Sequence, residues 1–161
     1  MDQIARQIVL KALPERVWRA ISDSARFGAW FGVAFDGPFV AGTHVVGRIV
    51  PTRVDPDVAA LQEPHRGKVW QAWVEQIEPM RLFSYRWHPF AVDPARDYSA
   101  EPTTRVRFEL AEADDGTLLT ITETGFDAIP SDRRAAAIAA NSGGWDHQLR
   151  LIEKYLSLEP G

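Results

Sequence analysis

The chain has 161 residues, a formal net charge of −4 at pH 7 and no cysteine. The missing cysteine excludes disulfides, thiolate metal ligands and a cysteine nucleophile. It is typical of proteins of the reducing cytoplasm, where we expect this one to act. The acidic balance argues against nucleic-acid binding, which normally requires a basic face. No apolar run approaches the ~18 residues of a membrane-spanning helix, and we expect no secretion signal.

The length predicts one domain over residues 1–161. A chain of this size buries roughly two-thirds of its unfolded surface, so we expect it to fold without a disulfide or a metal. Its aromatic content is high, with six tryptophans and eight phenylalanines. Each of these large rings needs a place in a core, a cavity wall or an interface.

The N-terminal part predicts one strand followed by two short helices. Residues 3–12 alternate apolar and polar side chains, as a strand does. A helix is predicted over 14–22, because a proline stands at its first position and apolar residues recur at helical spacing. Asp23 or Ser24 is a suitable N-cap for the second helix, which we expect to end at Gly32.

A run of strands is predicted for the middle of the chain. They are rich in β-branched and aromatic residues and span 33–36, 43–53, 67–78, 82–88, 103–112 and 117–124. The Asp-Asp-Gly sequence at 114–116 predicts a hairpin turn. Two stretches rich in proline and charge, 54–65 and 89–102, are predicted to be loops, and both are long enough to cover the mouth of a cavity.

A long helix is predicted over residues 130–157. Its apolar residues recur in steps of three and four at Ile138, Trp145, Leu149, Ile152 and Leu156. Gly143 and Gly144 interrupt it, each at a cost of about 1 kcal/mol relative to alanine. We favour a kink or a boundary between two helices there. The alternative is that the glycines make the helix thinner at this point, so that another group can come close to it. Grouped strands with helices outside them predict an α+β fold with a mainly antiparallel sheet.

Four segments together carry a family resemblance. They are Pro14–Asp23 with Trp30 and Phe31, Ile77–Pro79 with Leu82, Tyr85 and Trp87, Gly116–Glu123 with Gly125 and Phe126, and Gly144–Trp145 with Leu149, Ile152, Tyr155 and Leu156. The chain resembles the SRPBCC superfamily, also called START-like or birch-pollen-allergen-like. Within it, the chain is most similar to homologues of the C-terminal domain of the heat-shock protein 90 ATPase activators.

The resemblance implies a helix-grip fold, in which a curved antiparallel sheet wraps around the C-terminal helix. Members of the superfamily hold lipids, sterols, polyketides or other apolar molecules between the sheet and this helix. Some members are enzymes, such as aromatase/cyclases, whereas the chaperone activators bind a partner protein. Because one fold hosts many activities, the resemblance alone does not select among these.

On this resemblance, apolar and aromatic side chains of the strands and the helix are expected to line a ligand cavity. The candidates are Trp70, Val74, Phe83, Tyr85, Trp87, Phe108, Trp145 and Leu149. Alternation places the first two on one face of their strand, and likewise Phe83, Tyr85 and Trp87 on theirs. For each ring taken alone, filling the core is the simpler interpretation.

Catalytic and metal-binding patterns are not visible in the sequence. The histidines lack the spacing of metal ligands and stand at His44, His65, His88 and His147. No motif for a serine nucleophile or a phosphate-binding loop is present, and we expect no cofactor. Glu75 and Glu123 lie in predicted strands and form a possible acid pair, but we favour solvent-facing carboxylates on the outer face of the sheet.

Three functions follow as hypotheses. The first is non-catalytic binding of an apolar small molecule, as a carrier or sensor. The second is a protein-binding module with a chaperone partner, and the third is a cyclase-like enzyme, which requires a polar catalytic pair inside the cavity. The chain is expected to act as a monomer or a homodimer.

Overall fold

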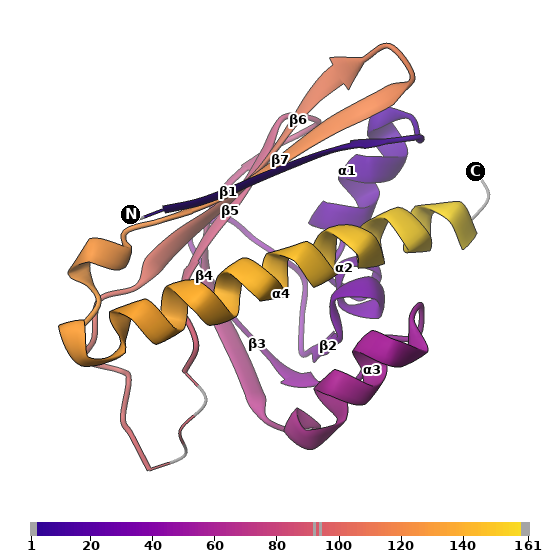
Figure 1. The fold of residues 1–161 in the computed structure, drawn as a ribbon. Helices are drawn as coiled ribbons and strands as arrows, with labels where there is room; N and C mark the ends of the chain where they lie inside the picture. Colours follow the sequence, from indigo (N-terminus) through magenta and orange to yellow (C-terminus); the bar gives the residue numbers. More distant parts are fainter. Residues whose placement is uncertain (1–2, 92, 94, 159–161) are drawn as a thin grey trace.

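A seven-stranded antiparallel sheet forms the frame of the protein in the computed structural model, which describes residues 3–91, 93 and 95–158. The strands follow the spatial order β1-β7-β6-β5-β4-β3-β2. Their bounds are β1 Gln3–Leu10, β2 Val33–Phe35, β3 His44–Ile49, β4 Val69–Glu78, β5 Leu82–Trp87, β6 Thr104–Ala113 and β7 Gly116–Thr124. The sheet is curved, and one long helix crosses its concave side (Figure 1).

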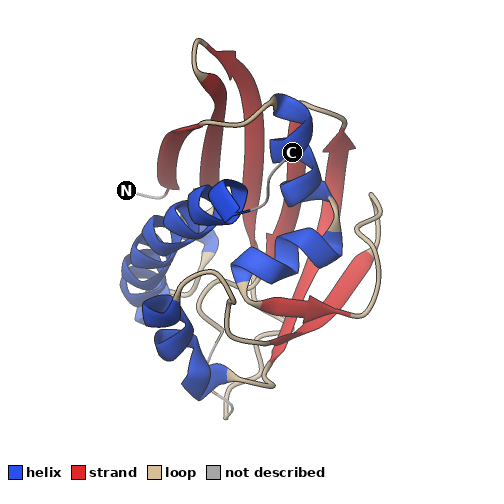
Figure 2. Cartoon of the chain, turned by 90° about the vertical axis from the view of Figure 1, so that its right-hand side faces the viewer, coloured by secondary structure: helices blue, strands red, loops and turns tan. Residues whose placement is uncertain are grey.

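The helices lie on one side of the sheet (Figure 2). They are α1 Pro14–Ser22, α2 Ser24–Phe31, α3 Pro56–Gln62 and α4 Ser131–Leu158, with short 3-10 turns at Glu63–His65 and Phe126–Ala128. Helix α4 contacts β1, α1 and α2. The α+β class, the helix-grip arrangement and the two short helices after the first strand are thus confirmed.

Helices α1 and α2 carry the chain from one edge of the sheet to the other, because β1 and β2 are the two edge strands. Pro14 opens α1 at a position where its missing N–H costs nothing. Asp23 caps α2 by accepting from the backbone N–H groups of Ala25 and Arg26. Gly32 ends α2 in the left-handed conformation, at φ 100°.

The loop predicted over residues 54–65 is wrong, because most of this segment is helical. The Asp55 carboxylate accepts from the backbone N–H groups of Asp57 and Val58, and Pro56 takes the first helical position. The prolines that suggested a loop therefore stand where helices accept them. The stretch 89–102 contains no helix or strand within its described residues, as expected.

Gly143 and Gly144 lie inside one uninterrupted helix, so the interpretation as a boundary between two helices is wrong. At either glycine, an added Cβ atom would meet no other heavy atom within 4 Å. Gly144 also lines a pocket.

Replacing Gly143 by alanine should raise the free energy of unfolding by about 0.5–1 kcal/mol, because alanine loses less backbone entropy in a helix. Urea denaturation measures the change. Gly28→Ala is the contrasting variant, since its Cβ would overlap the carbonyl oxygen of Val33 and destabilise the protein. A Gly143→Ala protein less stable than the parent would mean that the helix needs glycine at this turn.

The core lies between the concave face of the sheet and the helices. Its largest fully buried side chains include Trp30, Tyr85, Phe27, Phe83, Phe108 and Phe126. The indole N–H of Trp30 donates to the carbonyl oxygen of Ala20, so this ring is buried without an unsatisfied donor. Among the residues that the structure describes, none of the helices has the length and hydropathy of a membrane span.

Candidate functional site

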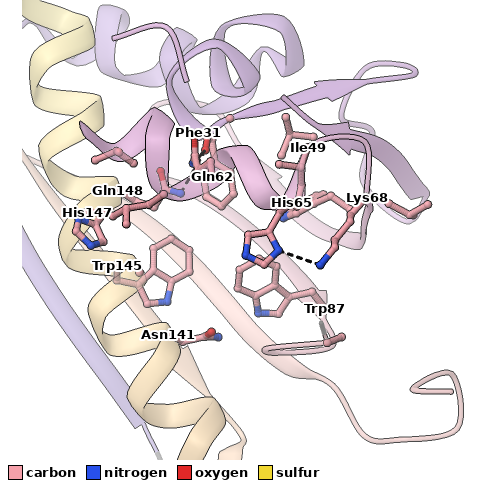
Figure 3. A pocket seen from close by; sticks show the side chains of 18 residues that line it. Phe31, Ile49, Gln62, His65, Lys68, Trp87, Asn141, Trp145, His147 and Gln148 are labelled. Carbon is pink, nitrogen blue, oxygen red and sulfur yellow. Dashed lines mark hydrogen bonds between the residues drawn. The ribbon is translucent and has the colours of Figure 1, made fainter. Parts of the chain in front are cut away.

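A cavity of about 340 Å³ lies between α4, α3 and the adjoining ends of β4 and β5 (Figure 3). Its volume falls within the range of small-molecule sites. Helix α3 contributes Val58, Leu61 and Gln62, so the segment predicted to be a loop forms one wall. Gln62 fixes that wall, because its side chain accepts from the backbone N–H of Thr52 and donates to the carbonyl oxygen of Phe31.

Four aromatic rings in mutual contact form the apolar part of the cavity wall. Phe31 lies 5.8 Å from Trp70 and 6.2 Å from Trp145, measured between ring centroids. The ring of Trp87 lies 5.6 Å from that of Trp70 and 5.8 Å from that of Trp145, so each of the four rings contacts two of the others. The rings come from α2, β4, β5 and α4, so the cavity exists only in the folded chain.

Glu123 is fully buried on β7 directly behind this wall. The indole N–H groups of Trp87 and Trp145 donate to its Oε2 and Oε1, at 2.8 Å and 2.9 Å. The Thr104 hydroxyl donates to Oε2 at 2.6 Å, and Nδ2 of Asn141 donates to both oxygens at 3.0 and 3.1 Å. An indole N–H can only donate, so both oxygens act as acceptors.

This carboxylate joins helix α4 to three strands. Its donors stand on β5, β6 and α4, and these hydrogen-bond donors are all neutral groups. Five hydrogen bonds replace the water that a buried carboxylate loses, which is the condition for burying a charge. Glu123 therefore braces the helix against the sheet beneath the cavity.

The expectation that Glu123 faces solvent is wrong. Alternation along β7 places it on the same face as Leu119 and Ile121, both of which are buried, and this signal outweighs the general preference of carboxylates for water. Nor does it pair with Glu75, which binds Arg86 and Arg105 at 3.1 and 2.7 Å. The hydrogen bond from Arg105 holds the pKa of Glu75 below its usual value.

Tyr85 lies in line with Glu123 on the inner face of the sheet, with Val106 of β6 between them. Burial raises the pKa of its hydroxyl well above the usual value, and the charge of Glu123 adds to the effect. The hydroxyl oxygen is buried without a hydrogen-bond partner. Tyr85 is therefore a neutral group of the core.

The structure divides the eight predicted cavity residues into two groups. Trp70, Trp87 and Trp145 line the cavity. The others are buried in the adjoining core and do not line it: Val74, Phe83, Tyr85, Phe108 and Leu149.

Sequence reasoning missed several residues of the cavity. Asn141 and Gln148 lie one turn of α4 or less from Trp145, on the same helical face. His65 and His147 also line it, and the described residues contain no cluster of side chains suited to a metal ion. The signal for the first two is their helical spacing, because Asn141 stands four residues before Trp145 and Gln148 three residues after it.

The loop 89–102 reaches the cavity through Ala91 and is fastened to the start of α4. Arg133 binds Glu101 at 2.8 Å, donates to the carbonyl oxygen of Pro89 at 2.7 Å and lies 4.8 Å above the ring of Tyr98. Burial of Glu101 opposes its ionisation, but the hydrogen bonds from Arg133 and Arg96 outweigh this and lower its pKa.

A curved antiparallel sheet that grips a long C-terminal helix, with a cavity beside that helix, defines a helix-grip protein of the SRPBCC type. Residues 11–157 match the family described as Activator of Hsp90 ATPase homolog 1-like protein. The chain belongs to this family, which confirms the resemblance seen in the sequence. Comparison with curated proteins gave no significant match.

Solved structures share the fold at low sequence identity. A protein of Mesorhizobium loti, MLL2253, aligns with a TM-score of 0.70 at 23% identity, over 99% of both chains. BPP1335 of Bordetella parapertussis aligns with a TM-score of 0.66 at 23% identity, over 100% of this chain and 78% of that one. DynU16, from the dynemicin biosynthetic locus, aligns with a TM-score of 0.68 at 20% identity, over 98% of this chain and 48% of its own. These likenesses establish the fold alone.

Proposed function

We propose that the protein binds an apolar, ring-containing small molecule in the cavity between α3, α4 and the sheet. The observation that carries the proposal is the contiguous aromatic wall that Phe31, Trp70, Trp87 and Trp145 form along a cavity of about 340 Å³. Ligand sites typically combine apolar and aromatic walls with a few placed polar groups, here Asn141 and Gln148. The presence of a similar fold in a biosynthetic locus supports a small-molecule role.

Native mass spectrometry of protein purified from its own host, followed by organic extraction, tests the proposal directly. We expect a discrete apolar compound that leaves the protein on extraction, and its identity would also show whether a cyclase-like reaction is worth assaying. Empty protein that also fails to take up hydrophobic dyes and ring compounds would contradict small-molecule binding.

Gly144→Leu should weaken the binding of a neutral hydrophobic dye such as Nile red at least tenfold, because the new side chain would enter the cavity. Gly143→Leu is the matched control, since it makes the same change on the exposed neighbouring position. Its affinity should stay within about twofold of the parent. Fluorescence titration measures both, and equal affinities in the two variants would place the dye elsewhere.

A protein partner is the second candidate function, and family membership supports it. Leu61 and Val69 add a specific observation, because they stand at the cavity with 60% and 52% of their surfaces exposed. A pull-down with the host's Hsp90-type chaperone tests this function. Binding that is lost in Leu61→Ser but kept in Gly144→Leu would assign the mouth of the cavity to a partner protein.

A further inference from the structure

The inner polar edge of the cavity presents a hydrogen-bond acceptor from Asn141. Its Nδ2 group donates to both oxygens of Glu123. The reverse orientation of the amide would place its oxygen against two carboxylate oxygens, so Glu123 fixes which end of the amide faces it. The oxygen atom Oδ1 is then the polar atom that Asn141 has left for the cavity it lines.

Gln148 lines the same cavity but offers it no free acceptor. Its Nε2 donates to the carbonyl oxygen of Phe31 at 3.3 Å, and its Oε1 is enclosed by protein atoms without a hydrogen-bond partner. Asn141 and Trp145 stand at positions i and i+4 of α4, so the Asn141 amide and the Trp145 indole lie on one face of the helix.

The charge around the cavity favours a cation at its inner end. Glu123 carries its charge directly behind Trp87, Trp145 and Asn141, with neutral donors around it. Faces of tryptophan rings attract cations. Lys68, the lysine of the cavity lining, is exposed, and its ammonium lies 3.0 Å from Nδ1 of His65. Charges in contact with solvent are screened more strongly than buried ones.

We propose that the ligand is an apolar ring compound that carries a protonated amine, with the nitrogen donating to Oδ1 of Asn141 and the rings lying among the tryptophans. This inference rests on the proposed function, because it specifies the chemistry of the small molecule that the cavity takes. A carboxylate or phosphate at the inner end is disfavoured, because it would face an acceptor and the charge of Glu123.

Three matched probes test the inference on the unaltered protein: 2-naphthylethylamine, 2-naphthylethanol and 2-naphthylacetate. Isothermal titration calorimetry at pH 7 should rank them amine, alcohol, acid, with the amine at least tenfold tighter than the acid. Equal affinities, or a preference for the acid, would overturn the inference that the ligand carries a protonated amine. The proposed binding of a small molecule would still stand. An alcohol that binds as tightly as the amine would overturn the requirement for charge. No binding by any probe, together with empty protein from the host, would remove the proposed function itself.

Asn141→Leu should weaken the binding of the amine and of the alcohol about fivefold or more, because both donate to Oδ1 in the parent protein. Ser142→Leu is the matched control, because it makes the neighbouring position of α4 leucine and this position does not line the cavity. Its affinity for both probes should stay within about twofold of the parent. Unchanged affinities for the amine and the alcohol in a folded Asn141→Leu variant would overturn the assignment of Asn141. The ranking in the parent protein decides the proposal even where Asn141→Leu fails to fold.

Discussion

Replacing Glu123 by leucine should lower the free energy of unfolding by about 4 kcal/mol or more. The change leaves the indole N–H groups of Trp87 and Trp145 without their acceptor, and both Trp145 and the substituted position are buried. The Thr104 hydroxyl and the Asn141 amide lose theirs as well. Each unsatisfied buried donor costs about 1–3 kcal/mol, and the apolar contacts of leucine offset only part of the sum.

Urea denaturation followed by far-ultraviolet circular dichroism measures this loss. Glu75→Gln is the matched control, because it also removes a strand carboxylate with two good partners, Arg86 and Arg105. Its partners are partly exposed, so the change should cost less than about 1 kcal/mol. A Glu123→Leu protein within about 1 kcal/mol of the parent would show that the carboxylate does not brace α4 against the sheet.

The contrast between these two glutamates shows what the sequence could and could not predict. Alternation with Leu119 and Ile121 predicts the inner face for Glu123, whereas the general preference of carboxylates for solvent predicts the outer face. The donors that reverse this preference come from β5, β6 and α4. Their meeting depends on strand register and on the position of α4, which local patterns do not give.

The elements themselves were more predictable than the cavity. Period-two and period-3.6 patterns identified the seven strands and α4, because each buries one face against the same core. Helix α3 was missed although Asp55 and Pro56 are a cap followed by a first helical residue. The sequence could not predict which aromatic rings border the cavity. Trp87 and Tyr85 share one face of a strand, and of these two only Trp87 lines the cavity.

Arg133→Met should free the loop 89–102 from α4 and speed amide hydrogen exchange within it about 100-fold. Arg133 is 8% exposed and its partner Glu101 is 11% exposed, so the pair is largely removed from solvent. Breaking a buried pair by removing one partner costs about 3 kcal/mol or more, and about 1.4 kcal/mol corresponds to a tenfold change in an opening equilibrium. The loop also loses the contacts to Pro89 and Tyr98.

Hydrogen exchange monitored by mass spectrometry resolves the loop from the rest of the chain. Arg134→Met is the matched control, because the neighbouring arginine binds the carbonyl oxygens of Asp127 and Ile129 and not the loop. It should leave exchange in 89–102 unchanged. Equal exchange of the loop in the Arg133 variant and the parent would contradict the anchor.

Acid should open the same loop in the parent protein. The pKa of Glu101 in the folded chain lies below its ordinary value of 4.5, so the anchor contributes fully above that pH. Its contribution is lost as the pH falls through the lowered pKa, where the folded state takes up the proton that breaks the pair. In Arg133→Met the carboxylate has lost its main buried partner, so the acid-induced increase in exchange should be smaller. Because Ala91 of this loop lines the cavity, the anchor links the state of one carboxylate to access to the cavity.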